Sequence, residues 1–182
     1  MKKILVPLAE GFEEIEAITI IDLLRRAGAE VIIASLNKRN VTGSHGLKVI
    51  ADTVLDEVLN DDFEMVVLPG GVPGAPNLMG DTRIIKLLKD QAAASKISAA
   101  ICAAPAVLQE AGLTEDKKIT SHPAWAERMT TAVHTGARVE TTDLLVTGQA
   151  AGSAMEFSFK LIETLFGIEK VAEVNTVVLA KL

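Results

Sequence analysis

Short runs of apolar residues alternate along the chain with longer segments in which apolar and polar residues recur at helical spacing. The runs contain mainly Ile, Leu, Val and Ala, which is typical of parallel strands that are buried on both faces. They predict strands over Ile4–Leu8, Val31–Ala34, Met65–Leu68, Ile97–Ile101, Lys118–Thr120 and Leu144–Val146. The amphipathic segments predict helices over Glu13–Ala27, Asp81–Ala94, Ala103–Ala111 and Ser153–Phe166, with a further helix that begins at Pro123.

This alternation predicts an α/β fold, a doubly wound and mostly parallel sheet with helices on both faces. The stretch Asn37–Ala51 contains two glycines and is expected to be an irregular excursion or a hairpin, and the tail Ile168–Leu182 adds a helix or a strand. Because no repeat, low-complexity tract or linker interrupts the pattern, we expect one domain over residues 1–182. Ligands of such folds bind at the carboxyl ends of the strands, where three segments lie. These are Glu10–Glu16, Pro69–Gly74 and Cys102–Pro105.

Composition narrows the class of protein. With 182 residues, 49% apolar and 23% charged, the chain can bury a sizeable core. A net charge of −6 and the lack of a basic stripe make a nucleic acid unlikely as the main partner. A single cysteine excludes an internal disulfide and, with no secretory signal, leads us to expect a cytoplasmic protein. The longest apolar stretch, Ile97–Leu108, contains Pro105 and is too short for a membrane span.

The candidate nucleophile is Cys102, which directly follows a predicted strand and opens a predicted helix. Apart from Ile101, the residues around it are small, and small residues permit the tight turn of a nucleophile elbow. They are Ser98, Ala99, Ala100, Ala103 and Ala104. The amino end of a helix would lower the pKa of this thiol and favour the thiolate. The alternative interpretation is a buried structural cysteine, since free cysteines are often buried.

Glycines follow another predicted strand, Met65–Leu68. In Pro69-Gly70-Gly71 they allow backbone N–H groups to approach a ligand, and with the N–H of Ala103 they could form an oxyanion hole. The alternative is a plain turn.

Acidic and histidine side chains could assist the thiolate. Of the acidic residues 10, 13, 14 and 16, most are expected to be solvated charges at a helix start, but one could reach the thiolate and stay protonated beside it. His122 follows a short strand and is a candidate base. His45 and His134 are expected to be surface residues, and no metal site is predicted.

Taken together and in order, several motifs make the chain resemble the ThiJ/PfpI superfamily over essentially its whole length. The branch it is most similar to contains the parkinsonism-associated protein deglycase. The motifs are Gly11-Phe12-Glu13-Glu14-Ile15-Glu16, Arg25-Arg26-Ala27-Gly28, Val67-Leu68-Pro69-Gly70-Gly71, Ala100-Ile101-Cys102-Ala103-Ala104-Pro105 and Thr120-Ser121-His122-Pro123.

The resemblance implies a flavodoxin-like core, a homodimer with the site close to the subunit interface, and activity towards methylglyoxal and related α-oxoaldehydes. It implies that Cys102 is the nucleophile and redox centre, Glu16 its protonated partner and His122 a nearby histidine. It also assigns the oxyanion-stabilising backbone to Gly70, Gly71 and Ala103. The roles it suggests are glutathione-independent glyoxalase, protein deglycase, redox sensor and chaperone.

The sequence departs from the family pattern near the expected pocket. Ser44-His45 stands where close relatives carry Arg, and Gln149-Ala150-Ala151-Gly152 stands in place of a Gly-Pro-Gly-like stretch. Ala103 follows the cysteine where the protease branch has His, and Pro123-Ala124 follows His122 where amidotransferases have His-x-Glu. These differences count against protease and amidotransferase activities.

We therefore expect a cofactor-free enzyme of the glyoxalase/deglycase type that acts on α-oxoaldehydes or on their early adducts with amines and thiols. The thiolate of Cys102 would attack the aldehyde, and Glu16, with or without His122, would move the proton between adjacent carbons. The alternative is a redox sensor or chaperone that uses the same cysteine without turnover. Hydration of an isocyanide or another small electrophile also stays open.

Overall fold

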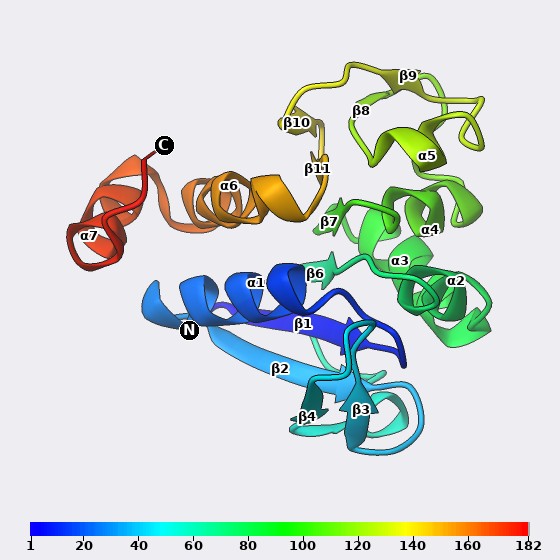
Figure 1. The fold of residues 1–182 in the computed structure, drawn as a ribbon, viewed down its shortest axis with the longest axis horizontal. Coiled ribbons are helices and arrows are strands. Elements are labelled where there is room, and N and C mark those ends of the chain that lie inside the picture. Colours follow the sequence, from blue (N-terminus) through cyan, green and yellow to red (C-terminus); the bar gives the residue numbers. More distant parts are fainter. Residues whose placement is uncertain (182) are drawn as a thin grey trace.

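A seven-stranded sheet forms the centre of the computed structural model, which describes residues 1–181 (Figure 1). The strand order is β10-β11-β7-β6-β1-β2-β5, and every neighbouring pair is parallel except β10 and β11. The predicted mostly parallel α/β sheet is therefore confirmed. In sheet order the strands are β10 (Val139–Thr142), β11 (Leu145–Gly148), β7 (Ile97–Ile101), β6 (Met65–Leu68), β1 (Lys3–Leu8), β2 (Glu30–Ser35) and β5 (Thr53–Val54).

Helices cover both faces of this sheet, because alternate side chains of its central strands point to opposite sides. Ile4 and Val6 of β1 pack with side chains of α1 and α6, whereas Leu5 packs with side chains of α3 and α4. In chain order the helices are α1 (Glu14–Arg26), α2 (Gly74–Met79), α3 (Thr82–Ala93), α4 (Pro105–Glu110), α5 (Pro123–Ala126), α6 (Ala154–Phe166) and α7 (Ile168–Val178).

Two small sheets and two helical turns complete the described chain. The predicted excursion contains an antiparallel hairpin, so that alternative is confirmed, and a second pair of strands is parallel. The hairpin is β3 (Asn40–Thr42) with β4 (Lys48–Ile50), the parallel pair is β8 (Lys118–Ile119) with β9 (Val133–His134), and the 3₁₀ turns span Leu55–Glu57 and Ala151–Ser153.

The start of α3 agrees with the cap that the sequence predicts. The side chain of Asp81 accepts a hydrogen bond from the Arg83 N–H and caps α3, as the sequence predicts. The tail forms α7 up to Val178, which settles its helix-or-strand alternative, and Leu182 lies outside the described residues. The longest helices have 13 residues, and none within residues 1–181 is long and apolar enough to cross a membrane.

Strand β10 is the main element that the sequence pattern does not predict. Its Val-Glu-Thr-Thr sequence has a single apolar residue, since it lies at a sheet edge and none of its residues is buried. It turns into β11 through Asp143, which adopts a left-handed backbone with φ of 52°. An edge strand of this kind gives too little apolar signal to detect from sequence.

Candidate active site

The turn that carries Cys102 is held in an uncommon backbone conformation. Cys102 directly follows β7 and has a φ of 64°, in the left-handed region where a side chain is disfavoured. Its N–H donates to the Gly148 oxygen at 3.0 Å, and its carbonyl accepts from the His122 N–H at 2.9 Å. These two bonds, one from each side, hold the strained turn that the strand–turn–helix pattern predicts.

The helix after Cys102 starts later than predicted. The pattern places its start at Ala103, but α4 begins at Pro105. The left-handed residue cannot belong to a right-handed helix, and the Ala104 N–H closes a turn onto the Ile101 oxygen at 3.0 Å. The thiol is therefore separated from the helix amino end by a turn.

Glu16 reaches the same place from α1. Its carboxyl group is fully buried, and Oε2 accepts a hydrogen bond from the Gly70 N–H at 2.8 Å. Gly70 separates this carboxyl group from the cysteine: a β-carbon built on it would lie 2.8 Å from both Cys102 Cβ and Glu16 Oε2. Only glycine at this position lets the carboxyl and thiol side chains come together.

Burial of this pair raises both pKa values. Burial is the largest influence on Glu16, the nearby charge of Glu13 adds to it, and hydrogen bonds from Gly70 and the thiol oppose it. The net effect raises the pKa of Glu16 to about 7. Burial, the charge of Glu16 and the hydrogen bond with Glu16 together raise the pKa of Cys102 to about 12. Between these values the two groups share one proton, carried either by the sulfur or by the carboxyl group.

The expected lowering of the thiol pKa is therefore wrong in direction. N–H groups of Ala103 and Gly71 do bond to the sulfur and lower the pKa of Cys102, but burial and Glu16 outweigh them. A thiolate forms here only when its proton passes to Glu16 or leaves the pair. The raised pKa of Glu16 agrees with the expectation of a carboxyl group that can stay protonated.

The three backbone groups predicted for an oxyanion hole have different roles. The N–H groups of Gly71 and Ala103 act on the sulfur and lower the pKa of the thiol. That of Gly70 is already bonded to Glu16 Oε2, so in this structure it orients the carboxyl group instead of being available to an oxyanion. Sequence spacing alone could not distinguish two adjacent glycines.

His122 is hydrogen-bonded to Cys102 through its backbone and not through its ring. Its N–H holds the Cys102 carbonyl oxygen, while ring Nδ1 accepts a hydrogen bond from the Ala124 N–H at 3.2 Å and caps α5. Among the hydrogen bonds of residues 1–181, none joins the ring to Cys102 or Glu16. A neutral ring that accepts at Nδ1 carries its proton on Nε2.

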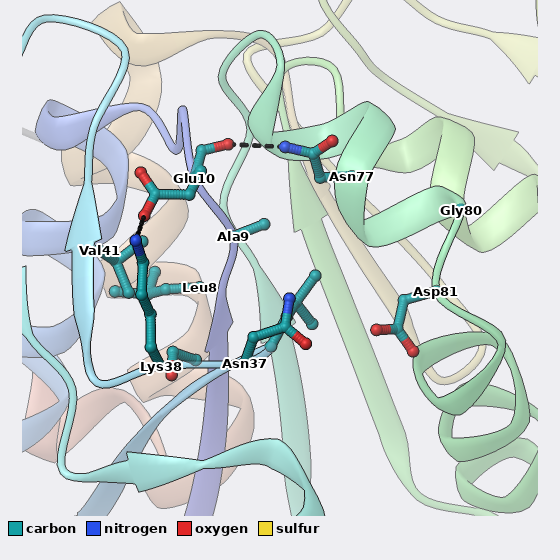
Figure 2. A pocket seen from close by; sticks show the side chains of 11 residues that line it. Leu8, Ala9, Glu10, Asn37, Lys38, Val41, Asn77, Gly80 and Asp81 are labelled. Carbon is teal, nitrogen blue, oxygen red and sulfur yellow. Dashed lines mark hydrogen bonds and ion pairs between the residues drawn. The ribbon is translucent and has the colours of Figure 1, made fainter.

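A cavity of about 450 Å³ lies at the carboxyl ends of β1 and β2 (Figure 2). The residues that line it include Glu10, Ser35 and Asn37 but not Cys102, Glu16 or His122. It is therefore a place separate from the thiol.

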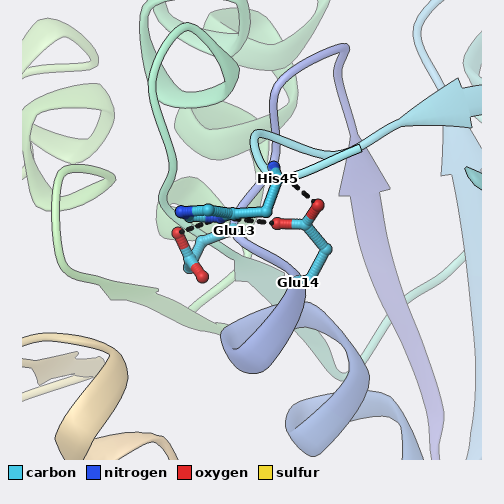
Figure 3. A group of neighbouring side chains, drawn as sticks. All are labelled: Glu13, Glu14 and His45. Atoms are coloured by element: carbon cyan, nitrogen blue, oxygen red, sulfur yellow. Dashed lines mark hydrogen bonds and ion pairs between the residues drawn. The ribbon is translucent and has the colours of Figure 1, made fainter. Parts of the chain in front are cut away.

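Glu14 is not the solvated charge expected at a helix start. It is 9% exposed, and its Oε1 accepts a hydrogen bond from the His45 N–H at 2.7 Å (Figure 3). Oε1 also accepts from the Leu47 N–H at 3.2 Å. Burial acts to raise the pKa of Glu14, but its own N–H, those of His45 and Leu47 and the His45 ring outweigh burial and lower it to about 2. Glu14 thus fastens the β3–β4 hairpin to α1, and Ser44 joins it with Oγ 3.2 Å from Oε2.

The same group is the part of residues 1–181 in which side chains could share a metal ion. Ligand atoms of Glu13, Glu14 and His45 lie within 4.8 Å of one another. His45 is exposed, as expected, although its ring Nδ1 lies 3.2 Å from Glu14 Oε2. Hydrogen bonds within the group already account for this arrangement.

The second segment that departs from the family pattern, Gln149–Gly152, begins directly after Gly148, whose carbonyl oxygen binds the Cys102 N–H. Gly148 accepts from the Cys102 N–H, and Gln149 then donates to the Arg138 and Gly136 carbonyl oxygens at 3.0 Å each. Both segments that depart from the family pattern therefore lie next to the thiol site. Ser44-His45 binds Glu14 on α1, and Gln149–Gly152 follows Gly148.

A sequence model of the family described as DJ-1/PfpI matches residues 2–164. The chain belongs to this family. Protein dj-1beta of Drosophila melanogaster is 40% identical over 180 residues, which cover 95% of this chain and 94% of that protein. A protein of Caenorhabditis elegans named glutathione-independent glyoxalase DJR-1.2 is 35% identical, with 92% and 89% covered.

Solved structures of DJ-1/PfpI proteins share the fold throughout. The crystal structure of Drosophila melanogaster DJ-1beta superposes with a TM-score of 0.97 at 38% identity and covers 100% of this chain and 99% of that one. The oxidized DJ-1 of Toxoplasma gondii gives 0.96 at 38% identity, with 100% of both chains covered. The chain spans only 40% of the length of Arabidopsis thaliana DJ-1 homolog B, to which it is 41% identical over 96% of its own length.

Proposed function

We propose that this protein is a cofactor-independent glyoxalase or deglycase that acts on methylglyoxal and related α-oxoaldehydes, or on their early adducts with amines and thiols. The observation that carries the proposal is the buried carboxyl–thiol pair of Glu16 and Cys102 across Gly70. A relative named glutathione-independent glyoxalase adds support at the level of the family.

The reaction starts when the shared proton lies on Glu16 and the sulfur is a thiolate. The thiolate adds to the aldehyde carbon of methylglyoxal, and Glu16 gives its proton to the new oxyanion, which yields a hemithioacetal. The carboxylate then removes the proton from the former aldehyde carbon and returns it to the neighbouring carbon through an enediol. The product of this transfer is a lactoyl thioester, which water hydrolyses to lactate and the free thiol.

The backbone around the sulfur suits this chemistry. N–H groups of Gly71 and Ala103 that bond to the sulfur before the reaction can turn to the oxyanion as it forms. His122 enters the proposal as the group that exchanges protons with water, because a ring that accepts at Nδ1 holds a proton on Nε2.

The test is lactate formation from methylglyoxal without glutathione, followed by proton NMR with wild type, Cys102→Ala and Glu16→Gln. We expect turnover in the wild type, a loss of about 10³-fold or more in Cys102→Ala, and a loss of about 10²-fold in Glu16→Gln. Turnover by Cys102→Ala close to the wild-type rate would overturn the covalent mechanism, and an inactive wild type would overturn the glyoxalase proposal. Hemiaminals and hemithioacetals that methylglyoxal forms with amines and thiols, assayed in parallel, separate the deglycase form of the proposal from the glyoxalase form.

A second candidate function, that of a redox sensor or chaperone, rests on the same pair. Cys102 is the only cysteine, so a sulfenic acid cannot form an internal disulfide. Peroxide would oxidise the thiol in two steps to a sulfinate, with each peroxide reduced to water, and protonated Glu16 would donate a hydrogen bond to it. Intact-mass spectrometry during a peroxide titration should show a species heavier by two oxygen atoms at Cys102 before any methionine oxidises.

We also propose a homodimer, as the resemblance implies. Ile18 of α1, Met155 of α6 and Val177 of α7 line one groove and are 41%, 37% and 69% exposed. Ile15, one turn before Ile18 on α1, is 59% exposed. A second copy would cover these apolar side chains. Light scattering at micromolar concentration should give the mass of two chains, and a monomer would overturn this assembly.

A further inference from the structure

Strand β11 contacts the strained turn at Cys102 directly. It runs parallel to β7 with Gly148 opposite Ile101, so its last residue lies beside the last residue of β7 before the turn. The Gly148 carbonyl oxygen accepts the Cys102 N–H at 3.0 Å. This bond fixes the amino side of Cys102.

The preceding residue of β11 has a longer connection to the same turn. Thr147 is 1% exposed, and its Oγ1 accepts a hydrogen bond from the Thr120 N–H at 2.9 Å. Thr120 is fully buried and lies two residues before His122, whose N–H donates to the Cys102 carbonyl oxygen at 2.9 Å. Thus Gly148 holds one side of Cys102, and Thr147 holds the other through the segment that contains His122.

Removing the Thr147 hydroxyl group would leave the buried Thr120 N–H without this acceptor. An unpaired buried N–H is costly, so the segment would shift to find another partner. The far side of the segment is bonded separately, because Thr120 Oγ1 donates to the Ala137 carbonyl oxygen at 2.6 Å. The segment can therefore move away from β11 and stay attached to its other neighbours.

The turn at Cys102 is sensitive to such a shift. A residue with a φ of 64° and a side chain keeps this backbone only where its surroundings hold it. If the His122 N–H moves away, the carbonyl group of Cys102 loses its partner and the turn can relax. The sulfur would then leave the N–H groups of Gly71 and Ala103 and the carboxyl group of Glu16.

We propose that Thr147 is a positioning residue that holds Cys102 in its strained turn by fixing the segment before His122. It takes no part in making or breaking bonds of the substrate. Its effect on turnover rests on the proposed glyoxalase chemistry, whereas its effect on the turn does not.

Matched variants separate this role from general stability. Thr147→Val keeps the shape of the side chain but removes the acceptor, and Thr147→Ser keeps the hydroxyl group. Thr114→Val is the control, because Thr114 is also fully buried and its Oγ1 has no hydrogen-bond partner within residues 1–181. If circular dichroism shows that Thr147→Val does not fold, Thr147→Ala removes the same acceptor without placing a methyl group against the Thr120 N–H.

Three measurements follow the turn and its chemistry. Amide hydrogen exchange by NMR reports the bonds of Cys102 and His122, with the amides of β6 as the reference for global opening. Alkylation by iodoacetamide, in which the sulfur–carbon bond forms and iodide leaves, reports the reactivity of Cys102 through intact mass. Methylglyoxal kinetics give kcat and KM.

We expect exchange at Cys102 and His122 in Thr147→Val to speed up by about tenfold more than exchange at β6, the effect of one lost hydrogen bond. The value of kcat should fall about tenfold with KM within about threefold, because the reacting groups are misplaced. Alkylation at pH 8 should become faster, since a thiol that leaves Glu16 and its buried surroundings loses the causes that raise its pKa. Thr147→Ser and Thr114→Val should both behave like the wild type.

An equal change in exchange at β6, Cys102 and His122 would overturn the proposal, because Thr147 would then support only overall stability. Wild-type kcat and alkylation in Thr147→Val would overturn it as well, and so would a Thr147→Ser variant that restores neither. A wild type without methylglyoxal turnover would overturn the glyoxalase proposal alone, because exchange and alkylation still decide the role of Thr147.

Discussion

Glu14 and Glu16 lie two residues apart on α1, both are buried, and their pKa values shift in opposite directions. Glu14 faces the β3–β4 hairpin and has a pKa lowered to about 2, whereas Glu16 faces the thiol and has one raised to about 7. Burial favours the protonated acid in both. The two carboxyl groups differ in the number of hydrogen-bond donors around them. Glu14 accepts backbone N–H groups at Oε1, and the Ser44 hydroxyl and the His45 ring lie at its Oε2. Glu16 accepts the Gly70 N–H at Oε2, while its Oε1 has no hydrogen bond within residues 1–181.

The comparison teaches that hydrogen-bond donors, and not burial alone, decide which carboxylate is structural and which can carry a proton. One turn of a helix can therefore hold both kinds of carboxyl group, with one side fastening a hairpin and the other facing the thiol. The following predictions test this division, from the largest expected effect to the smallest.

The largest expected effect comes from removing the sulfur that Glu16 faces. We expect Cys102→Ala to lower methylglyoxal turnover by about 10³-fold or more, because the sequence contains no other thiol. The fold should persist, since alanine needs no partner that the thiol supplied, and circular dichroism checks this. Substantial turnover by the variant would remove Cys102 from the chemistry.

The carboxyl groups themselves should separate activity from stability. Glu16→Gln should lower kcat by about 10²-fold, because an amide cannot shuttle the proton. Glu14→Gln should leave kcat within about threefold but lower the free energy of unfolding by about 1–3 kcal/mol, because an amide has one acceptor oxygen for the bonds that the carboxylate receives. Glu13→Gln serves as the control, with small effects on both. Steady-state kinetics and urea unfolding of the three variants would contradict the division if all lost activity equally.

Gly70 should be important for turnover because Cys102 and Glu16 lie on either side of it. In Gly70→Ala the new methyl group meets Cys102 Cβ and Glu16 Oε2 at 2.8 Å, so the pair must move apart. We expect turnover to fall by about 10-fold or more, the effect of misplacing reacting groups. Gly152→Ala is the control, since nothing lies within 4 Å of its added β-carbon. Equal kinetics for the two variants would show that the close approach at Gly70 is unimportant.

The two carboxyl groups should also respond to pH in separate windows. The folded pKa of Glu14 lies below its unfolded value of 4.5, so its contribution to stability is present above that value and is lost as pH falls towards 2. The folded pKa of Glu16 lies above 4.5, so its contribution is present below that value and is lost as pH rises through 7. Urea unfolding from pH 3 to 8 should show the difference between wild type and Glu14→Gln narrowing in acid. The difference from Glu16→Gln should change between pH 4.5 and 7, and no change there would contradict the raised pKa.

Much of the fold could be predicted because its central strands carry a strong aliphatic signal. Strands such as Met65–Leu68 and Ile97–Ile101 have the bounds that the pattern predicts. The edge strand β10 and the late start of α4 could not be found that way. One has a single apolar residue, and the other depends on the left-handed backbone of Cys102.

The motifs predict which residues form the candidate site, but they do not predict the electrostatics of the site. Position along the chain places Cys102 and Glu16 at the same edge of a parallel sheet, whereas the sign of the thiol pKa shift depends on how deeply the pair is buried. The N–H of Gly70 likewise bonds to Glu16 for reasons of three-dimensional geometry. The residues Gly43-Ser44-His45-Gly46 are typical of a turn, but nothing in the sequence identifies Glu14 as the side chain that this turn binds.

The left-handed backbone at Cys102 also shapes how this protein can change over generations. Glycine adopts a φ of 64° without a steric cost, so Cys102→Gly should relieve strain even as it removes the thiol. A laboratory selection that rewards only folded yield would then favour loss of the nucleophile, whereas selection for chemistry must retain a residue that the backbone disfavours. Libraries built to stabilise this chain should therefore keep position 102 fixed.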